Sequence, residues 1–333
     1  MLGILDLDPP MNAPRPQSWL LAALLLLCAC TPPPEPRLRM GTIPWPGSEP
    51  LFLGQQLGLI PAQRVHLVEY RSSAQLRRAF RNGAIDAVSA SLEEVLSLEQ
   101  FGHDPRVVLV LDASHGADCL MVRPGVDSLS GLKGQRIGSE ESLLGMYMLT
   151  RVLEQAGLRR EDVRLEFSPL ETHVEAWQRG TLDAVVTFEP YCQRLAGVGA
   201  RRLFDSASIP GEIVDVLVVR KDFLEAWPRQ VDALVRGWFA TLAWKQQHPE
   251  EAMQRMAGRL GMEPRRLHEA LSGVRFMDAP AQRALLTGAR PGLQDTIERM
   301  GELLRHHQLL PGLPGRTESS RMLDAAPLLR VSP

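Results

Sequence analysis

The sequence predicts an α/β protein built from two similar lobes, and three observations lead to that class. "RNGAIDAV" at 81–88 is echoed by "QRGTLDAV" at 178–185, 97 positions later. "RMG" at 39–41 is echoed by "RIG" at 136–138 with the same offset. Short apolar strands alternate with helical segments between these anchors, which is the pattern of βαβ units and parallel sheets. Anchors that keep one offset over about fifty residues indicate two equivalent α/β units.

Each unit is expected to hold strands and helices in the same order. A first strand opens the unit, and the helix that follows closes at "LGLI" or "AGL". The second strands are "VHLVEY" and "VRLEFSPL", and the third strands are "AIDAVSA" and "TLDAVVTF". Gly83 and Gly180 are expected just past a helix C-terminus, where glycine is favoured. Asp86 and Asp183 are expected to cap or line the turn that follows, which is a structural role.

Strands on either side of the second unit indicate that it is inserted into the first lobe. Apolar strands are expected at 107–114 and 118–124 before it and at 214–219 after it, and the chain becomes helical from Leu224. Two strands that flank an inserted lobe form a hinge. The predicted boundaries are 38–120 and 214–310 for lobe 1, 121–213 for lobe 2, and 311–333 for a loose C-terminal tail.

Composition limits the classes of function. The chain has 333 residues, and 44% of them are apolar, which is enough for two cores of ordinary domain size. A net charge of −2 provides no general attraction for nucleic acid or anionic membranes. Aromatic residues make up only 5%, and no basic run with interleaved aromatics is present. Nucleic acid is therefore not an expected partner.

The N-terminal segment resembles an export signal that ends in a lipid-attachment site. The apolar run at 19–29 is too short to span a bilayer and suits a signal peptide. Met11 is the expected start, because "MLGILDLDPP" has the wrong charge for the beginning of a signal. "LCAC", ending at Cys30, is similar to the lipobox of bacterial lipoproteins, which implies cleavage before Cys30 and a diacylglycerol on its sulfur. We expect a signal peptide at 1–29 and an acylated, Pro-rich tether at 30–37. An ordinary secretory signal is the alternative.

The two remaining cysteines leave their pairing open. Cys119 and Cys192 have neither CxxC spacing nor a neighbouring histidine cluster, which argues against a metal site. An exported protein can form a disulfide, but two cysteines alone do not establish one. Neither a metal nor a cofactor is expected.

Six motifs, in the order that the family has them, resemble solute-binding proteins of ABC transporters. They are "GTIPWPGSEPLFLGQQLGLI", "RAFRNGAIDAVSASLEEVL", "LDASHGAD", "SLSGLKGQRIG", "GTLDAVVTFEPY" and "IPGEIVDVLVVR". The most similar group serves nitrate, taurine, aliphatic sulfonates and thiamine-pyrimidine precursors, and the likeness covers nearly all of 38–310. The resemblance implies a type II periplasmic binding fold, in which two lobes close over one ligand. It also implies a small-molecule solute and ABC permease and ATPase subunits as partners of a lipid-anchored protein on the outer face of a bacterial membrane. A monomer is expected.

Ligands of open α/β sheets bind outside the carboxyl ends of the strands, so the loops there provide the candidate residues. Trp45 stands between two prolines and is expected to form a flat wall for the ligand, although packing on its own helix would also explain it. Ser48 and Glu49 are candidates that helix capping explains equally well. In relatives that bind sulfonate or nitrate, N–H groups at the helix start near 142–145 hold the anion. The candidate ligand-binding residues are Trp45, Ser48, Glu49, Ser89, Ser91, Ser114, His115, Ser142, Leu143, Gly145, Thr187, Glu189 and Asp215.

The candidate loops are rich in acids, and His115 is their main basic residue. The acids are Glu49, Glu93, Asp118, Glu140, Glu141, Glu189, Glu212 and Asp215. A carboxylate about 4 Å from a small anion repels it by about 4 kcal/mol at an effective dielectric near 20. We therefore expect a neutral or cationic solute rich in N–H donors, led by an aminopyrimidine-like heterocycle, with sulfonate or nitrate as the alternative. Trp45 would stack on its ring, and Glu49 or Glu189 would accept its N–H groups.

Two other functions remain open at this point. Fungal pyrimidine synthases share the fold and are enzymes, but their cysteine-rich "CCCFC"-type motif is absent. A P-loop, a GxSxG elbow and a visible nucleophile–base pair are absent as well, so no enzyme activity is expected. A lipoprotein that binds a solute and reports to a membrane kinase would show the same sequence features.

Overall fold

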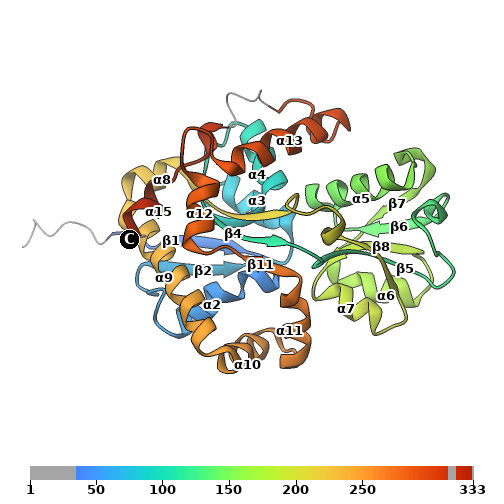
Figure 1. Cartoon of the computed structure of the whole chain (residues 1–333), viewed down its shortest axis with the longest axis horizontal. Coiled ribbons are helices and arrows are strands. Elements are labelled where there is room, and N and C mark those ends of the chain that lie inside the picture. The colour runs from blue at the N-terminus through green and yellow to red at the C-terminus, as the bar shows by residue number, and fades with distance from the viewer. Residues whose placement is uncertain (1–34, 314–319, 332–333) are drawn as a thin grey trace, which may run out of the picture. The chain divides into compact units, whose positions relative to one another are not determined.

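The computed structural model describes residues 35–313 and 320–331 (Figure 1). The predicted signal peptide and Cys30 lie outside the described residues. From Arg37 onward the chain forms one unit, which contains two β-sheets. The strands are β1 (Leu38–Thr42), β2 (Val65–Glu69), β3 (Ala87–Ser91), β4 (Pro105–Ser114), β5 (Asp118–Val122), β6 (Arg136–Ser139), β7 (Arg164–Phe167), β8 (Ala184–Phe188), β9 (Arg201–Asp205), β10 (Val214–Arg220) and β11 (Val274–Phe276).

Helices connect the strands and continue after the last crossing between the sheets. They are α2 (Glu49–Gln56), α3 (Ser73–Arg81), α4 (Leu92–Gln100), α5 (Leu143–Ala156), α6 (His173–Gln178), α7 (Tyr191–Ala196), α8 (Lys221–Ala226), α9 (Pro228–Gln247), α10 (Pro249–Leu260), α11 (Pro264–Ser272), α12 (Ala279–Leu286), α13 (Gly292–His306) and α15 (Ala326–Val331). In the part of the chain that the structure describes, no helix is both long enough and apolar enough to cross a membrane.

The two units that the sequence repeat predicts have the same strand arrangement. In the first sheet, β2, β1 and β3 are neighbouring parallel strands, and in the second sheet β7, β6 and β8 are. The full orders are β11-β4-β10-β3-β1-β2 and β7-β6-β8-β5-β9. An antiparallel strand follows each parallel trio, β10 beside β3 and β5 beside β8.

The repeated residues form the same arginine–aspartate contact in both sheets. Asp86 accepts hydrogen bonds from the backbone N and Nε of Arg39, at 3.0 and 2.8 Å. Asp183 accepts the same pair from Arg136, at 3.0 and 2.9 Å. Each arginine also donates through Nη2 to the carbonyl of the repeated glycine, which has φ of 68° or 73°. Glycine is favoured there because other residues rarely adopt positive φ. The repeat therefore encodes a clamp between the first strand of each unit and the turn before its third strand.

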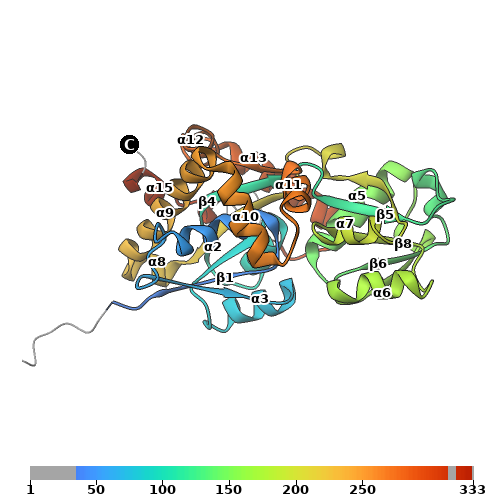
Figure 2. The ribbon, with the colours of Figure 1, turned by 90° about the horizontal axis from the view of Figure 1, so that it is seen from below.

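Helices cover both faces of each sheet (Figures 1 and 2). On the first sheet, α3, α4 and α13 lie on one face, and α2, α9 and α10 lie on the other. On the second sheet, α5 covers one face, and α6 and α7 cover the other.

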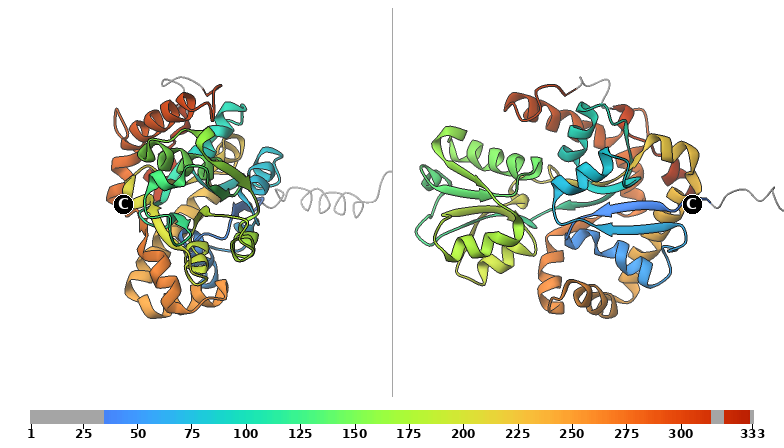
Figure 3. Two further views of the ribbon diagram at one scale, coloured as in Figure 1. Left: turned by 90° about the vertical axis from the view of Figure 1, so that its right-hand side faces the viewer. Right: turned by 180° about the vertical axis from the view of Figure 1, so that it is seen from behind.

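The chain crosses between the sheets twice (Figure 3). The first crossing lies at 115–117, between β4 and β5, earlier than the predicted start of lobe 2 at 121. The reason is that residues from Asp118 onward pair with β8 of the second sheet. The second crossing runs from β9 to β10. The hydroxyl oxygens of Ser114 and Ser206, 2.7 Å apart, join the two crossings.

The C-terminal segment packs against lobe 1, so the prediction of a loose tail was wrong for the described part of it. Met322 and Leu328 are completely buried, and Arg330 donates to both carboxylate oxygens of Asp232 on α9, at 2.9 and 2.8 Å. These two apolar side chains lie in the core, although the segment has too little periodicity to reveal them. The predicted helical region is also interrupted, because β11 joins the edge of the first sheet beside β4.

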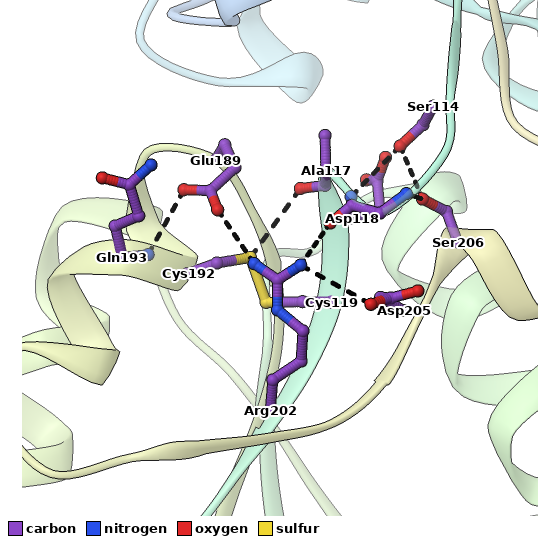
Figure 4. The surroundings of a disulfide bond; sticks show 11 residues. Ser114, Ala117, Asp118, Cys119, Glu189, Cys192, Gln193, Arg202, Asp205 and Ser206 are labelled. Atoms are coloured by element: carbon purple, nitrogen blue, oxygen red, sulfur yellow. Dashed lines mark hydrogen bonds and ion pairs between the residues drawn. A yellow bond between two sulfur atoms is a disulfide. The ribbon is translucent and has the colours of Figure 1, made fainter. Parts of the chain in front are cut away.

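Cys119 and Cys192, whose pairing the sequence left open, are joined by a disulfide (Figure 4). The bond connects β5 to α7 within lobe 2, where both residues are almost fully buried. They belong to an apolar cluster that includes Met121, Trp177 and Leu195. Within residues 35–313 and 320–331, no cysteine is therefore a free thiol.

Candidate ligand-binding cleft

A cavity of about 50 Å³ lies between the two lobes, with a mostly apolar wall. Lobe 1 contributes side chains from the ends of β1 and β3 and from α3 and α4, and lobe 2 contributes the start of α5 and the end of β8. Five of the predicted candidates lie on this wall, namely Trp45, Ser48, Ser89, Ser91 and Asp215. Residues of both lobes therefore border the same space.

Trp45 lies on the cavity wall and contacts the opposite lobe. Its ring meets Phe188 of β8 edge to face, with centroids 5.8 Å apart and an interplanar angle of 80°. Its Nε1 donates to Asp112 at 3.4 Å. An aromatic pair of this geometry contributes about 0.5–1.5 kcal/mol beyond its buried area, so this contact favours the closed arrangement.

Ser48 does not cap α2, although it occupies the N-cap position. Its hydroxyl accepts a hydrogen bond from Thr42 at 2.8 Å and lies 3.4 Å from the hydroxyl of Ser89. Capping therefore fails as the explanation of Ser48, and its side chain belongs to a row of hydroxyls beside the cavity.

Two aspartates stand side by side where the cavity meets the first sheet. Asp112 on β4 is paired directly with Asp215 on β10, and side chains of such cross-strand pairs share one face. Burial raises the pKa of both carboxyls, and repulsion by Asp112 raises the pKa of Asp215 further. Two carboxyls this close disfavour each other's charge, so the pKa of Asp215, which lines the cavity, lies well above its ordinary value.

Asp118 is a buried carboxyl on the same wall as Asp215. It is 2% exposed and begins β5, where the chain enters the second sheet. Burial raises the pKa of Asp118 to about 7, an effect that Ser114 opposes by hydrogen bonding and Glu189 increases by repulsion. This carboxyl therefore changes charge near neutral pH. Among the described residues on the wall, Arg77 is the only cationic one, and it is paired with Glu94.

Two glutamates hydrogen-bond across the cleft to a helix start in the other lobe. Glu94 on α4 accepts from the backbone N of Leu143, the first residue of α5, at 2.7 Å. Glu140, just after β6, accepts from the backbone N and the hydroxyl of Ser73, the first residue of α3, at 3.1 and 3.2 Å. Helix N-termini attract carboxylates, so both contacts hold the lobes together.

The expected roles of Glu49 and Glu189 do not agree with their positions. Glu49 turns away from the cavity to Arg259 of α10, with an Nε–Oε2 distance of 2.8 Å. Glu189 binds Arg202 at 2.9 Å and also lies outside the cavity wall (Figure 4). Burial raises the pKa of both glutamates and the arginines lower it. Each carboxylate therefore already has a cationic partner, and neither is placed to accept N–H groups from a solute.

Ser114 and His115 lie at the first crossing and not on the cavity wall. The hydroxyl of Ser114 accepts from the backbone N of Asp118 at 3.1 Å and contacts Ser206. The backbone N of His115 donates to the carbonyl of Gly273 at 2.7 Å. These contacts hold the hinge segments in place.

Ser142 and Gly145 at the start of α5, together with Thr187, line a second, smaller cavity of about 10 Å³ that shares three wall residues with the first, whereas Leu143 does not line it. Ser142 caps the helix by accepting from the backbone N of Gly145 at 3.0 Å. The backbone N of Leu143 already donates across the cleft. Thr187 is buried, and its hydroxyl has no hydrogen-bond partner among the described residues.

Sequence reasoning missed several wall residues as candidates. The main ones are Ile43, Arg77, Glu94, Leu144 and Phe188, and Asp118 was counted only among the acids of the loops. Ile43 and Arg77 lie outside the loops at the strand ends. Glu94, Leu144 and Phe188 lie within those loops, and Phe188 could have been found because it stands between the candidates Thr187 and Glu189.

The two α/β lobes, the two crossings and the cavity between them define the class of two-lobed periplasmic binding proteins with the type II fold. The alkanesulfonate-binding protein SsuA from Xanthomonas axonopodis pv. citri, solved with MOPS bound, superposes with a TM-score of 0.70 at 20% identity. That superposition covers 88% of this chain and 98% of that chain. The chain belongs to the NMT1-like family, whose model matches residues 31–261.

Two further similarities bear on function. The taurine-binding periplasmic protein of Escherichia coli (strain K12) is 27% identical over 175 residues, which are 51% of this chain and 53% of that protein. The chain spans about half the length of the curated relatives that it matches. The desulfurization enzyme DSZB superposes with a TM-score of 0.64 at 16% identity, over 89% of this chain and 99% of that one. The fold alone therefore does not separate binding from catalysis.

Proposed function

We propose that this chain is the solute-binding receptor of an ABC importer and closes its two lobes over one small organic solute. Membership of the NMT1-like family and likeness to proteins named for taurine and alkanesulfonate binding support the receptor role. The cavity between the lobes, with wall residues from both of them, supports closure around a solute. The joined cysteines support binding over catalysis, because neither described sulfur is available as a nucleophile.

The solute class that fits this site is a cation or a neutral molecule rich in N–H donors. The observation that carries this proposal is the pair of buried Asp118 and half-buried Asp215 on a mostly apolar wall, where Arg77, the one cation among the wall residues that the structure describes, is already paired. A buried carboxylate needs a hydrogen-bonding or charged partner, and such a solute would provide it.

A flat heterocycle is favoured over an aliphatic cation. Trp45 and Phe188 border the cavity from opposite lobes, and their edge-to-face pair offers apolar ring surface to a flat solute. A one-ring aminopyrimidine would place its ring against them and direct its N–H groups to Asp118 and Asp215. Taurine carries an ammonium group that suits Asp118, but its sulfonate needs donors that Glu94 already occupies at the start of α5.

Calorimetry on the protein tests this proposal. We expect an aminopyrimidine and an aromatic amidine to bind, and nitrate, taurine and an alkanesulfonate to bind at least roughly tenfold more weakly, a difference of about 1.4 kcal/mol. Tight binding of any of the three anions without a response to either N–H-rich compound would overturn the solute class. No binding of any compound would leave the receptor role without support.

We also propose that the protein is exported and held at the membrane by a lipid on Cys30. The lipobox-like run before Cys30 supports this anchor, and a diacylglycerol provides the two acyl chains that stable anchoring requires. Cys30→Ser is expected to move the protein from the detergent phase to the aqueous phase of a detergent extraction. Cys28→Ser is the matched control and should leave the partition unchanged. Equal partition of Cys30→Ser and the wild type would refute the anchor.

A further inference from the structure

We propose that Glu94 determines the charge of the solute: its carboxylate occupies the position that an anionic solute would take and so excludes anions from the cleft. This inference rests on the proposed receptor function and adds the residue that sets its selectivity. The candidate site is the junction of α3, α4 and the start of α5 between the lobes (Figure 1).

Glu94 is held on both sides by groups that favour a negative charge. One carboxylate oxygen accepts from the backbone N of Leu143 at 2.7 Å, and the other is paired with Nη1 of Arg77. The side chain of Glu94 is only 4% exposed, although it borders the cavity. The start of a helix together with an arginine is the environment that proteins use to bind sulfonate, phosphate or carboxylate ligands. Here the carboxylate of Glu94 occupies that site.

The other groups at the start of α5 provide few hydrogen-bond donors and little positive charge for an incoming anion. Ser142 already accepts from the backbone N of Gly145, at 3.0 Å. Glu140 adds a second carboxylate beside Arg77, because it reaches across the cleft to Ser73. One arginine therefore faces two glutamates, and a solute anion would have to displace Glu94 or lie against like charge.

Removing Glu94 should convert the same position into an anion site. In Glu94→Ala, Arg77 loses its carboxylate and the backbone N of Leu143 is freed, while the space of the side chain becomes available. A compact sulfonate such as methanesulfonate matches that space and those donors. We expect the variant to bind methanesulfonate roughly tenfold or more tightly than the wild type does.

The experiment compares four proteins by calorimetry and by thermal shift, with methanesulfonate and an aromatic amidine as the probes. Glu94→Ala is expected to gain methanesulfonate binding, and Glu94→Gln to gain less, because glutamine removes the charge but still fills the position. Glu141→Gln is the matched control, since Glu141 is an exposed acid next to the same helix start. It should respond as the wild type does. Circular dichroism checks that each variant is folded, and Glu94→Gln provides the test if the alanine variant does not fold.

Methanesulfonate binding that is equal in the wild type and in both Glu94 variants would overturn the proposal. A gain in Glu141→Gln equal to that in Glu94→Ala would overturn it as well, because the effect would then be one of net charge. The amidine separates this result from the receptor function. Its binding to the wild type tests the receptor function, whereas the difference between variants in methanesulfonate binding tests Glu94.

Discussion

Removal of the Cys119–Cys192 disulfide is expected to lower the free energy of unfolding of lobe 2 by about 4 kcal/mol. The bond links residues 73 positions apart. A cross-link of that span restricts the unfolded chain by roughly 4 kcal/mol of conformational entropy. The melting temperature of lobe 2 should fall by roughly 20 °C, since 1 kcal/mol corresponds to about 4–8 °C for a domain of about 100 residues. Scanning calorimetry of the wild type and of the Cys119→Ala/Cys192→Ala double variant measures the difference.

A reductant provides the control for this prediction. It should lower the melting temperature of the wild type to that of the double variant and leave the double variant unchanged. Both residues are buried in the Met121, Trp177 and Leu195 cluster, so the alanine variant also loses some packing, and reduction isolates the effect of the bond. If reductant leaves the wild-type melting temperature unchanged, the disulfide does not constrain the fold.

The fold was predictable because the sequence features that indicate it are local and occur in both repeats. The glycine and aspartate of each repeat occupy one turn, and their arginine partner lies on the neighbouring strand, as in the contact of Asp86 with Arg39. The helix Leu143–Ala156 begins within the predicted start at 142–145 and ends at the predicted closure "AGL". Such features depend on periodicity and turn chemistry, which neighbouring residues determine. The C-terminal segment was missed because its buried residues, Met322 and Leu328, show no such period.

The charge of the site was less predictable because it depends on partners that are distant in sequence. The loops at the carboxyl ends of the strands contain many acidic residues and almost no basic ones. In the structure, Arg259 neutralises Glu49 from 210 residues away, and Arg151 neutralises Glu212 from 61 residues away. Of the acids in those loops, Glu49 and Glu189, which were expected to accept N–H groups, have arginine partners, whereas Asp118 and Asp215 lie on the cavity wall. The expectation of an N–H-rich solute stays a proposal, now based on Asp118 and Asp215.

Asp118→Asn is expected to weaken binding of a cationic, N–H-rich solute by about 100-fold or more at a pH above 7. Truncating one partner of a buried, hydrogen-bonded charge pair costs about 2–5 kcal/mol, and Asp118 is the wall carboxyl that ionises most readily, since the pKa of Asp215 lies well above its ordinary value. Asparagine keeps the size and one acceptor oxygen. Asp118 is compared here with Asp215, because Glu94, the other carboxylate on the wall, is already paired with Arg77. Calorimetry with an aromatic amidine, which stays charged over this range, measures the loss. Asp205→Asn is a matched control at the hinge, because Asp205 lies outside the cavity wall.

The pH dependence of the same titration separates charge from shape. Burial raises the pKa of Asp118 to about 7, so below that pH a bound cation must displace a proton from it. The wild-type affinity should fall about tenfold from about pH 8 to about pH 6, and Asp118→Asn should show little change. Without solute, a rising pH lowers the stability of the folded protein, whereas it raises the affinity for the solute. The raised pKa lets the folded state keep a proton that the unfolded state loses near pH 4, so this carboxyl favours folding below about pH 4 and that contribution is lost as the pH rises through about 7. Equal wild-type affinity at both pH values would show that Asp118 is not the counter-ion of the solute.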